Sequence, residues 1–250
     1  MGQNGNNSVM VYVMAVIAAT GGLLFGFDTG VVSGAIPFLQ KDFGVTDGTV
    51  ELITTAGLIG AIIGALFGGK VTDRIGRRKV LLGAGFIFAV GALWSGFASN
   101  PGSLVAARLF LGIAIGASSF AVPLYIAEIS PTGIRGTLVS LFQLMITLGI
   151  LVAYFSDFAF ADESNLASWR PMFYVGVIPA LILFVGMIFL PESPRWLMSV
   201  GREKEALDVL GKTEGASAAS VASSIRKDIE KDSDVSSRWS DLFKPLWKMP

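Results

Sequence analysis

Two charged residues stand alone in long apolar stretches of the sequence and are the first candidates for chemistry. Asp28 interrupts the stretch 9–35, and Arg108 interrupts the stretch 103–127. A charge inside a bilayer is costly and usually functional, because lipid does not solvate it. A carboxylate there can bind and release a proton, and a guanidinium group can serve as its counter-ion. We therefore treat Asp28 and Arg108 as candidate proton-coupling residues.

The positions of Asp28 and Arg108 along their stretches predict that they are neighbours. If the two helices run in opposite directions with centres near residues 22 and 114, each charge lies about six residues, or ~9 Å, from the midplane on the same side. A carboxylate that leaves its arginine in one conformation could take up a proton on one face of the membrane and release it on the other. The alternative is a static ion pair that only fixes the register of the helices.

Neutral polar side chains recur on one face of a later apolar stretch, 136–155. Gln143, Thr147 and Tyr154 share this face at helical spacing, and Gln143 lies near the middle of the stretch. A glutamine offers both a donor and an acceptor, which suits a ligand rich in hydroxyl groups. A hydrogen bond between helices is the alternative interpretation.

The composition limits the chemistry that these residues can serve. The 250-residue chain has 52% hydrophobic and only 15% charged residues, whereas a soluble domain has about 25% charged residues. There is no histidine and no cysteine, so proton transfer must use Asp or Glu, and no thiolate metal site can form. The net charge of zero gives no reason to expect a nucleic-acid partner. We expect a protein of the lipid bilayer that uses protons and no other cofactor.

Six apolar stretches are long enough to cross a bilayer as helices, which takes about 20 residues each. We therefore predict an all-α membrane protein with a six-span bundle over residues 1–190 and a cytosolic segment over 191–250. The first stretch is longer than the apolar part of a secretory signal, so we expect it to be retained. The predicted spans are Val9–Ala35, Leu52–Val71, Val80–Ala98, Ser103–Ala127, Gly136–Phe155 and Pro171–Leu190, and the predicted cytosolic helices are Gly201–Leu210 and Ala216–Lys231.

Charge differences between the loops predict the orientation of the bundle. Lys and Arg collect in short loops on the cytoplasmic side, and the loop after the second span carries Arg74, Arg77, Arg78 and Lys79. Both chain termini are therefore expected in the cytoplasm. The loops of the opposite face carry only Lys41 and Arg170 as cations, set among Asp42, Asp47, Asp157, Asp162 and Glu163.

Glycines spaced by four residues predict close packing between helices. Small residues let helix backbones approach each other in lipid, where packing replaces the hydrophobic effect. Asp28 lies on the face of the first span that points away from its glycines. The glycine ridges are Gly22, Gly26, Gly30 and Gly34 on the first span, Gly60, Gly64 and Gly68 on the second, and Gly112 and Gly116 on the fourth.

Charged residues also gather in three segments on the predicted cytoplasmic side, 73–79, 128–136 and 191–197. Carboxylates and guanidinium groups at helix ends can form bidentate pairs that latch the helices together. A latch that breaks in one conformation would bias which side of the membrane is open. Topogenic positive charge is an alternative for Arg78 and Lys79, but it does not account for the glutamates of these segments.

At these motifs the sequence resembles the sugar-porter family of the major facilitator superfamily, which includes bacterial proton–sugar symporters and facilitative glucose transporters. The resemblance extends from Gly21 to about Leu210, and its motifs lie at 21–30, 73–78, 128–136 and 191–196. It implies the N-terminal half of a twelve-span transporter. Each half of that fold is a three-plus-three inverted repeat, and the two halves give alternating access.

The resemblance also implies roles for individual residues. Asp28 matches the coupling carboxylate of proton-coupled members, and Arg108 matches the arginine that serves as its counter-ion. Phe25 and Gln143 match sugar-contacting positions, and Thr147 shares the face of Gln143. The residues that match an intracellular charge latch are Arg74, Arg77, Glu128, Arg135, Glu192 and Arg195.

The sequence leaves several functional hypotheses open. Family members have twelve spans, whereas this chain reaches Pro250 near the place where a seventh would begin, so we expect a C-terminal half or a second copy as partner. The leading hypothesis is half of a proton-coupled monosaccharide symporter in the bacterial inner membrane. The alternatives are half of a facilitative sugar uniporter and a non-transporting folding or assembly module. Ile150 stands where one xylose symporter has a polar contact, so the sugar is not implied. An enzyme is not expected, because no nucleophile–base pair or phosphate loop occurs.

Overall fold

The computed structural model describes residues 3–234, and this part of the chain is built from helices without strands. The last part of the predicted cytosolic segment, 235–250, lies outside the described residues. The helices are α1 (Gln3–Phe43), α2 (Asp47–Ile75), α3 (Arg77–Phe97), α4 (Pro101–Ile129), α5 (Arg135–Phe160), α6 (Trp169–Val175), α7 (Val177–Phe189), α8 (Pro194–Ser199), α9 (Glu203–Thr213) and α10 (Ala218–Asp234), with short 3₁₀ turns at Leu166–Ser168 and Gly215–Ser217.

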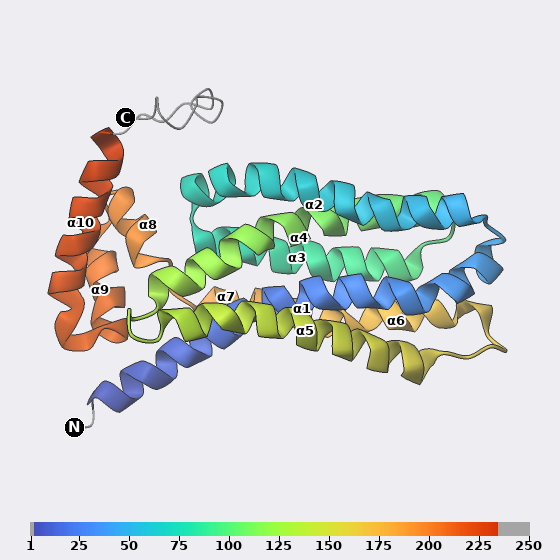
Figure 1. Cartoon of the computed structure of the whole chain (residues 1–250), viewed down its shortest axis with the longest axis horizontal. Helices are drawn as coiled ribbons and strands as arrows, with labels where there is room; N and C mark the ends of the chain where they lie inside the picture. The colour runs from blue at the N-terminus through green and yellow to red at the C-terminus, as the bar shows by residue number, and fades with distance from the viewer. Residues whose placement is uncertain (1–2, 235–250) are drawn as a thin grey trace, which may run out of the picture.

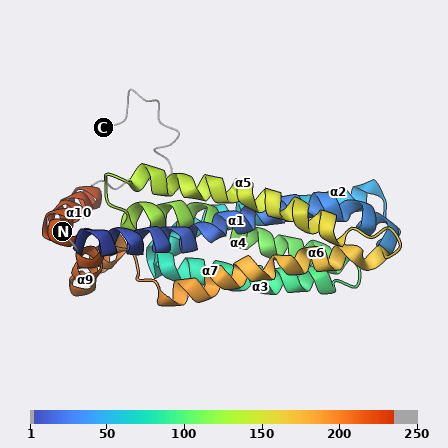
Figure 2. The same cartoon turned by 90° about the horizontal axis from the view of Figure 1, so that it is seen from below.

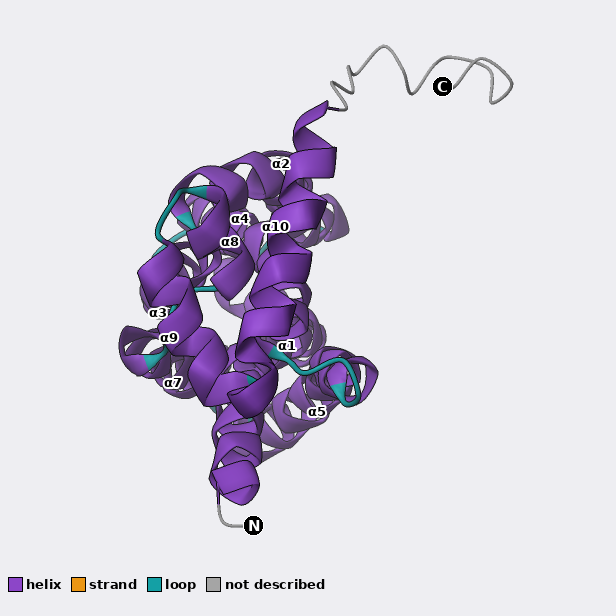
Figure 3. Cartoon of the chain, turned by 90° about the vertical axis from the view of Figure 1, so that its left-hand side faces the viewer, coloured by secondary structure: helices purple, strands orange, loops and turns teal. Residues whose placement is uncertain are grey.

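The long helices form one elongated bundle. Helices α1 to α7 run along its long axis, and α8, α9 and α10 lie across one end (Figure 1). Seen toward that end, α9 and α10 cover the ends of the membrane helices (Figure 3). Six segments of the described chain are long and apolar enough to cross a membrane, and the sixth of them, Leu166–Phe189, includes both α6 and α7. We call the end opposite α8–α10 the distal end of the bundle.

The sixth span is broken in its first half, which the sequence analysis did not predict. Gly176 separates α6 from α7, three residues before Pro179. Proline has no N–H to donate to the carbonyl of Val175, and its ring clashes with the preceding turn. A side chain at Gly176 would also contact the ring of Phe27 on α1, with its Cβ 3.0 Å from Phe27 Cε1. The break therefore follows from the proline, and the glycine lets α1 pack closely beside it.

Several helices extend beyond the predicted spans. Helix α1 has 41 residues rather than ending at Ala35, and α5 continues to Phe160 rather than Phe155. The extension of α5 places Asp157 inside a membrane helix, where it is 7% exposed. Its assignment to a loop was therefore wrong. The short helix α8 was also missed, because its apolar residues form less than two turns.

The predicted glycine ridges lie at the two closest helix contacts of the bundle. A Cβ on Gly26 of α1 would fall on the carbonyl oxygen of Ile146 in α5, and one on Gly60 of α2 would fall on that of Leu109 in α4. Backbones that approach this closely exclude any side chain. The glycine spacing thus correctly predicted packing, and the structure adds that α1 pairs with α5 and α2 pairs with α4.

The bundle has the arrangement of an inverted repeat. The first repeat comprises α1, α2 and α3, and the second comprises α4, α5 and the span formed by α6 and α7. The middle helix of each repeat packs on the first helix of the other, since α2 contacts α4 and α5 contacts α1. Figure 2 shows α1 and α4 in the interior, between α5 on one side and α3 and α7 on the other. The first helix of each repeat is therefore central, and these two helices carry Asp28 and Arg108.

Candidate functional site

Asp28 and Arg108 form a buried ion pair between the two central helices. Arg108 Nη1 donates to Asp28 Oδ1, and the two residues are only 4% and 7% exposed, Arg108 being the lower. Opposite charges at matched depth had predicted this contact, which is confirmed. A Cβ on Gly57 would lie 3.1 Å from Arg108 Nη2, so the glycine leaves room for the guanidinium group against α2. The Nε atom of Arg108 has no hydrogen-bond partner within the described chain.

A small cavity borders the Asp28 carboxylate. Its volume is about 20 Å³, and its lining includes Phe88, Phe173 and Gly176 at the break of the sixth span. A volume of roughly 10–15 Å³ is enough for one water molecule, but a water also needs polar partners. Asp28 is the only charged residue in this lining. The pair therefore lies in an apolar setting where one carboxylate meets one guanidinium group.

The polar face of α5 lies outside the contact that α5 makes with α1. Gln143 and Thr147 are both exposed, and Tyr154 is 54% exposed on the same face. The Thr147 hydroxyl donates to the backbone carbonyl of Gln143, with an oxygen–oxygen distance of 3.2 Å, and does not occupy the side-chain amide group of Gln143. The hydrogen bond between helices that was the alternative for Gln143 is not present among the described residues. Phe25 packs at the edge of the main apolar core and is partly buried.

At the end of the bundle near α8–α10, Arg77 and Glu128 form a bidentate pair. Arg77 Nε lies 2.9 Å from Glu128 Oε2 and Nη2 lies 3.1 Å from Oε1. Arg77 also donates to the Thr72 carbonyl at 3.2 Å and contacts the Asp73 carboxylate at 3.1 Å. The Ser193 hydroxyl donates to Glu128 at 2.5 Å. This part of the predicted latch is present, and it joins α3 to α4.

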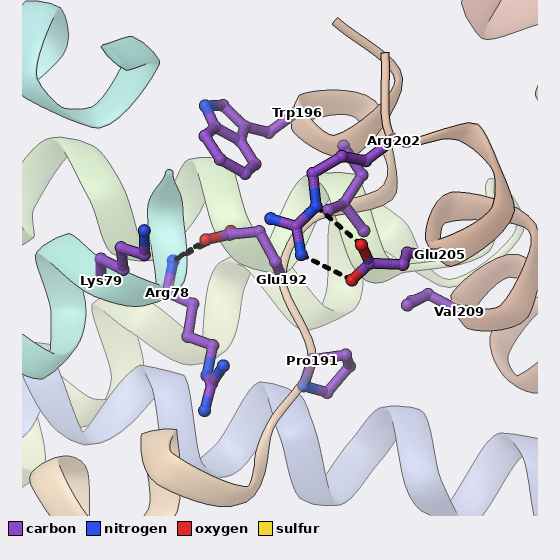
Figure 4. Close-up of a pocket in the computed structure, with 9 residues that line it drawn as sticks. Arg78, Lys79, Pro191, Glu192, Trp196, Arg202, Glu205 and Val209 are labelled. Carbon is purple, nitrogen blue, oxygen red and sulfur yellow. Dashed lines mark hydrogen bonds and ion pairs between the residues drawn. The ribbon is translucent and has the colours of Figure 1, made fainter. Parts of the chain in front are cut away.

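Glu192 differs from the expectation of a carboxylate–guanidinium pair. Its two carboxylate oxygens accept from the backbone N–H of Arg78 at 3.0 and 3.2 Å (Figure 4). Arg78 is the second residue of α3, where backbone donors lack partners inside the helix and the dipole favours a negative charge. Gly76 makes the preceding turn with a φ of +100°, and a Cβ there would overlap the Glu192 carboxylate. Glu192 is therefore an N-terminal cap of α3.

The remaining residues of the predicted latch have different surroundings. Arg135 donates to the Ser130 carbonyl at 3.2 and 3.3 Å and so closes its own loop. Arg74 is exposed on α2, and Arg195 is half-buried on α8. Topogenic charge was the alternative interpretation for Arg78, yet its guanidinium group donates to the carbonyls of Met187 and Ile188 at the end of α7, at 2.9 and 2.5 Å.

A second polar cluster at the distal end was missed by the sequence analysis. Trp169 Nε1 donates to Asp42 Oδ2 at 2.9 Å, and Arg170 Nη2 lies 3.7 Å from the same oxygen. Arg170 also donates to the carbonyls of Gly96 and Ala98 at the end of α3, at 3.0 and 2.7 Å. The cluster thus joins α1, α3 and α6. An acidic residue at the end of α1 and a Trp–Arg pair at the start of α6 were the available signals.

A pocket of about 320 Å³ lies between the membrane helices and the helices across their end (Figure 4). Arg202 and Glu205 line it and form a bidentate pair with distances of 2.7 and 2.6 Å. The hydrogen bonds from Arg202 hold the pKa of the Glu205 carboxyl below its ordinary value. Glu192 and Lys79 also line this pocket, so its charges are mixed rather than of one sign.

Comparison with known proteins assigns the chain to a family. The family model described as "Sugar (and other) transporter" matches residues 14–249. The chain belongs to this family. The galactose-proton symporter of Escherichia coli (strain K12) is 42% identical over 216 residues, which is 86% of this chain and 46% of that protein. The arabinose-proton symporter of the same strain is 44% identical over 197 residues, or 79% of this chain and 41% of that protein. The chain thus spans just under half the length of these curated relatives.

Solved structures of the family share the fold of the bundle. The proton:xylose symporter XylE bound to 6-bromo-6-deoxy-D-glucose matches with a TM-score of 0.89 and 31% identity, over 96% of this chain and 57% of that chain. The inward-open form of XylE from E. coli matches with a TM-score of 0.80 and 32% identity, over 88% and 56% of the two chains. This family member is therefore a multi-pass membrane protein with a six-helix half of the major facilitator fold, and its relatives are transporters rather than enzymes.

Proposed function

We propose that this family member forms the N-terminal half of a proton-coupled monosaccharide symporter. The observation that carries the proposal is the buried pair of Asp28 and Arg108 on the two central helices. The family and the named symporters among its relatives support the class of substrate. Because the chain spans about half of those relatives, its partner is a C-terminal half or a second copy of the chain.

Asp28 is the proton carrier in this mechanism, and Arg108 is its counter-ion. When a proton binds Asp28, the ion pair is neutralised and Arg108 is left with a buried charge that lacks a counter-ion. Arg108 then gains stability by moving away from Asp28 toward water or another acceptor. This coupling lets protonation favour one arrangement of the central helices over another, as alternating access requires. The mechanism uses protons as the coupling ion and no other cofactor.

The sugar is bound on the polar face of α5 in this proposal. Gln143 and Thr147 are exposed there and have donors and acceptors suited to hydroxyl groups. Phe25 lies on α1 and supplies an apolar surface for the ring of a sugar. The partner half supplies the opposite wall, because a small-molecule site buries most of its ligand. The side chains that select one sugar over another then come from both halves.

The end of the bundle with α8–α10 faces the cytoplasm in this proposal. Arg74, Arg77, Arg78 and Lys79 lie there, and the positive-inside rule places such a loop on the cytoplasmic side of the inner membrane. The distal end with Asp42 and Arg170 then faces outward. Both termini are cytoplasmic in this orientation.

Uptake by phospholipid vesicles tests the proposal. The chain is reconstituted alone and together with a C-terminal half from a related symporter, and accumulation of labelled hexoses and pentoses is measured with an inward proton gradient. We expect accumulation that is abolished by an uncoupler and by Asp28→Asn. Asp208→Asn, which neutralises an exposed carboxylate on α9, is the matched control and should retain accumulation.

The other outcomes separate the alternatives. Uptake that only equilibrates the sugar and ignores the uncoupler would indicate a uniporter. Binding of no sugar by a folded and associated sample would indicate an assembly module. Proton-driven accumulation that survives in Asp28→Asn would remove Asp28 from the coupling mechanism.

A further inference from the structure

A second carboxylate is buried in the membrane bundle, and the proposed coupling mechanism does not use it. Asp157 lies on α5, one turn before that helix ends at Phe160, and is 7% exposed. The Gly34 backbone lies against its carboxyl group, but neither carboxylate oxygen has a hydrogen-bond partner of normal geometry among the residues that the structure describes. The hydroxyl group of the adjacent Ser156 is also buried without a partner. A polar group that is buried without partners in a native protein requires an explanation.

The Asp157 carboxyl group is enclosed between α5 and Gly34 of α1. A Cβ on Gly34 of α1 would overlap the carboxyl group, and one on Gly30, a turn earlier, would lie 2.7 Å from the Cβ of Ala153. Asp157 therefore continues the row of contacts that the glycine ridge makes with α5. The space for its carboxyl group exists because position 34 has no side chain.

No cation forms an ion pair with Asp157 within residues 3–234. Helix α5 packs on α1, α4 and α6, and the charged groups of these helices are engaged elsewhere or lie outside the contact. On α1 and α4, Asp28 pairs with Arg108 and Glu128 pairs with Arg77. Arg170 pairs with Asp42 at the same end of the bundle as Asp157, and the exposed Lys41 lies about two turns beyond Gly34 on α1. Neither forms an ion pair with Asp157, and Arg135 contacts Ser130 at the opposite end of α5.

An ionised carboxylate cannot stay in such a place at low cost. Without a counter-ion or donors, a buried acid becomes neutral by binding a proton. Protonation also suits the surroundings, because a neutral carboxyl group packs against helix backbones without a charge to desolvate. The contrast with Asp28 is direct, since Asp28 has a guanidinium partner and Asp157 has none.

We propose that Asp157 is a second proton-binding site, which holds a proton while α1 and α5 are packed and exchanges it with water when their distal ends separate. The proton comes from water and adds to one carboxylate oxygen, and on separation it returns to water without any other bond changing. The two carboxylates lie on different sides of α1. Asp28 belongs to α1 and faces Arg108 of α4, whereas Asp157 belongs to α5 and packs against Gly34 of α1. Movement of the distal part of α1 would therefore change the surroundings of both. The proposal does not depend on the identity of the substrate or on the role of Asp28.

Infrared spectroscopy of the 250-residue chain in phospholipid vesicles tests this site. A protonated carboxyl group has a carbonyl stretching band that a carboxylate lacks. We expect such a band at neutral pH, its loss in Asp157→Asn, and its retention in Asp28→Asn. Asp162→Asn, in the exposed loop that follows α5, is the matched control and should also retain the band.

Two outcomes would overturn the proposal. One is a wild-type spectrum at neutral pH without a protonated-carboxyl band, and the other is a band that persists in Asp157→Asn. Asp157→Ser is a second variant that keeps a small neutral side chain, and it must lose the same band. Loss of the band with normal proton-driven uptake in Asp157→Asn would still support the site, and would show that it is separate from Asp28 in transport.

Discussion

Arg78 and Arg170 make equivalent contacts at opposite ends of the bundle. Arg78 begins the third helix of the first repeat and donates to the carbonyls of Met187 and Ile188, where the second repeat ends. Arg170 begins the third span of the second repeat and donates to the carbonyls of Gly96 and Ala98, where the first repeat ends.

The residue before each of these arginines completes the equivalence. Arg77 donates to Glu128 at the end of α4, and Trp169 donates to Asp42 at the end of α1. An arginine of each repeat therefore donates to carbonyls at the end of the other repeat, which a helix end leaves without partners. We call each such set of contacts a closure, and the one made by Arg170 the distal closure. All these contacts lie within the six-span bundle, so they hold its helices together as one body.

Removal of the distal closure should destabilise the bundle. Arg170→Leu leaves the carbonyls of Gly96 and Ala98 without this donor and removes the cation beside Asp42, and we expect a loss of about 1.5–3 kcal/mol in the free energy of unfolding. Thermal unfolding of the purified chain in detergent measures the change. Arg202→Leu removes an exposed arginine of a surface pair and should leave the unfolding temperature nearly unchanged. Equal losses in the two variants would contradict the closure.

The Arg77–Glu128 pair should show strong coupling between its partners. Glu128→Gln leaves the charge of Arg77, which is 8% exposed, without its main counter-ion, and we expect a loss of about 3 kcal/mol. The double variant Arg77→Met, Glu128→Gln removes both charges and should recover most of that loss. Chemical unfolding of the two single variants and the double variant gives the coupling energy. Additive losses would show that the two residues act independently.

The contact between α1 and α5 should tolerate no added methyl group at its centre. Gly26→Ala places a Cβ on the carbonyl oxygen of Ile146, and we expect a loss of about 1–3 kcal/mol from the forced separation of the helices. Gly83→Ala is the matched control, because Gly83 lies inside α3 and, apart from its chain neighbours and the adjacent backbone of its own helix, no atom lies within 4 Å of the added Cβ. Thermal unfolding should show Gly83→Ala unchanged or slightly stabilised, since alanine is the better helix former.

The Arg202–Glu205 pair should respond to pH below the ordinary range of a glutamate. The pKa of Glu205 is lowered by its hydrogen bonds to Arg202, so the pair is present at neutral pH and is lost as the pH falls through the lowered pKa. The carboxyl carbon shift of Glu205, followed by NMR, measures this titration. In Arg202→Gln the midpoint should rise to the ordinary glutamate value. An unchanged midpoint would show that the pair does not form in solution.

The sequence by itself determined the class of fold and the first layer of the candidate site. Hydropathy marked the six spans, glycine spacing marked the faces that pack closely, and the depth of Asp28 and Arg108 marked them as partners. These signals are readable because each depends on the position of a residue within one helix or on one bilayer depth. The polar face with Gln143 and Thr147 was also evident from helical spacing alone.

Only the tertiary structure decided which groups meet at the helix ends. A pattern of charges did not show that Glu192 would cap α3, that Arg78 and Arg170 would satisfy carbonyls, or that Trp169 would bind Asp42. It also did not show that α5 runs far enough to bury Asp157 against Gly34. The physical reason is that the partners of a polar group, and the water left to it, depend on where two helices end and which helix lies across from them. Packing between distant segments decides both the partners of a polar group and its access to water, and the local sequence does not predict that packing.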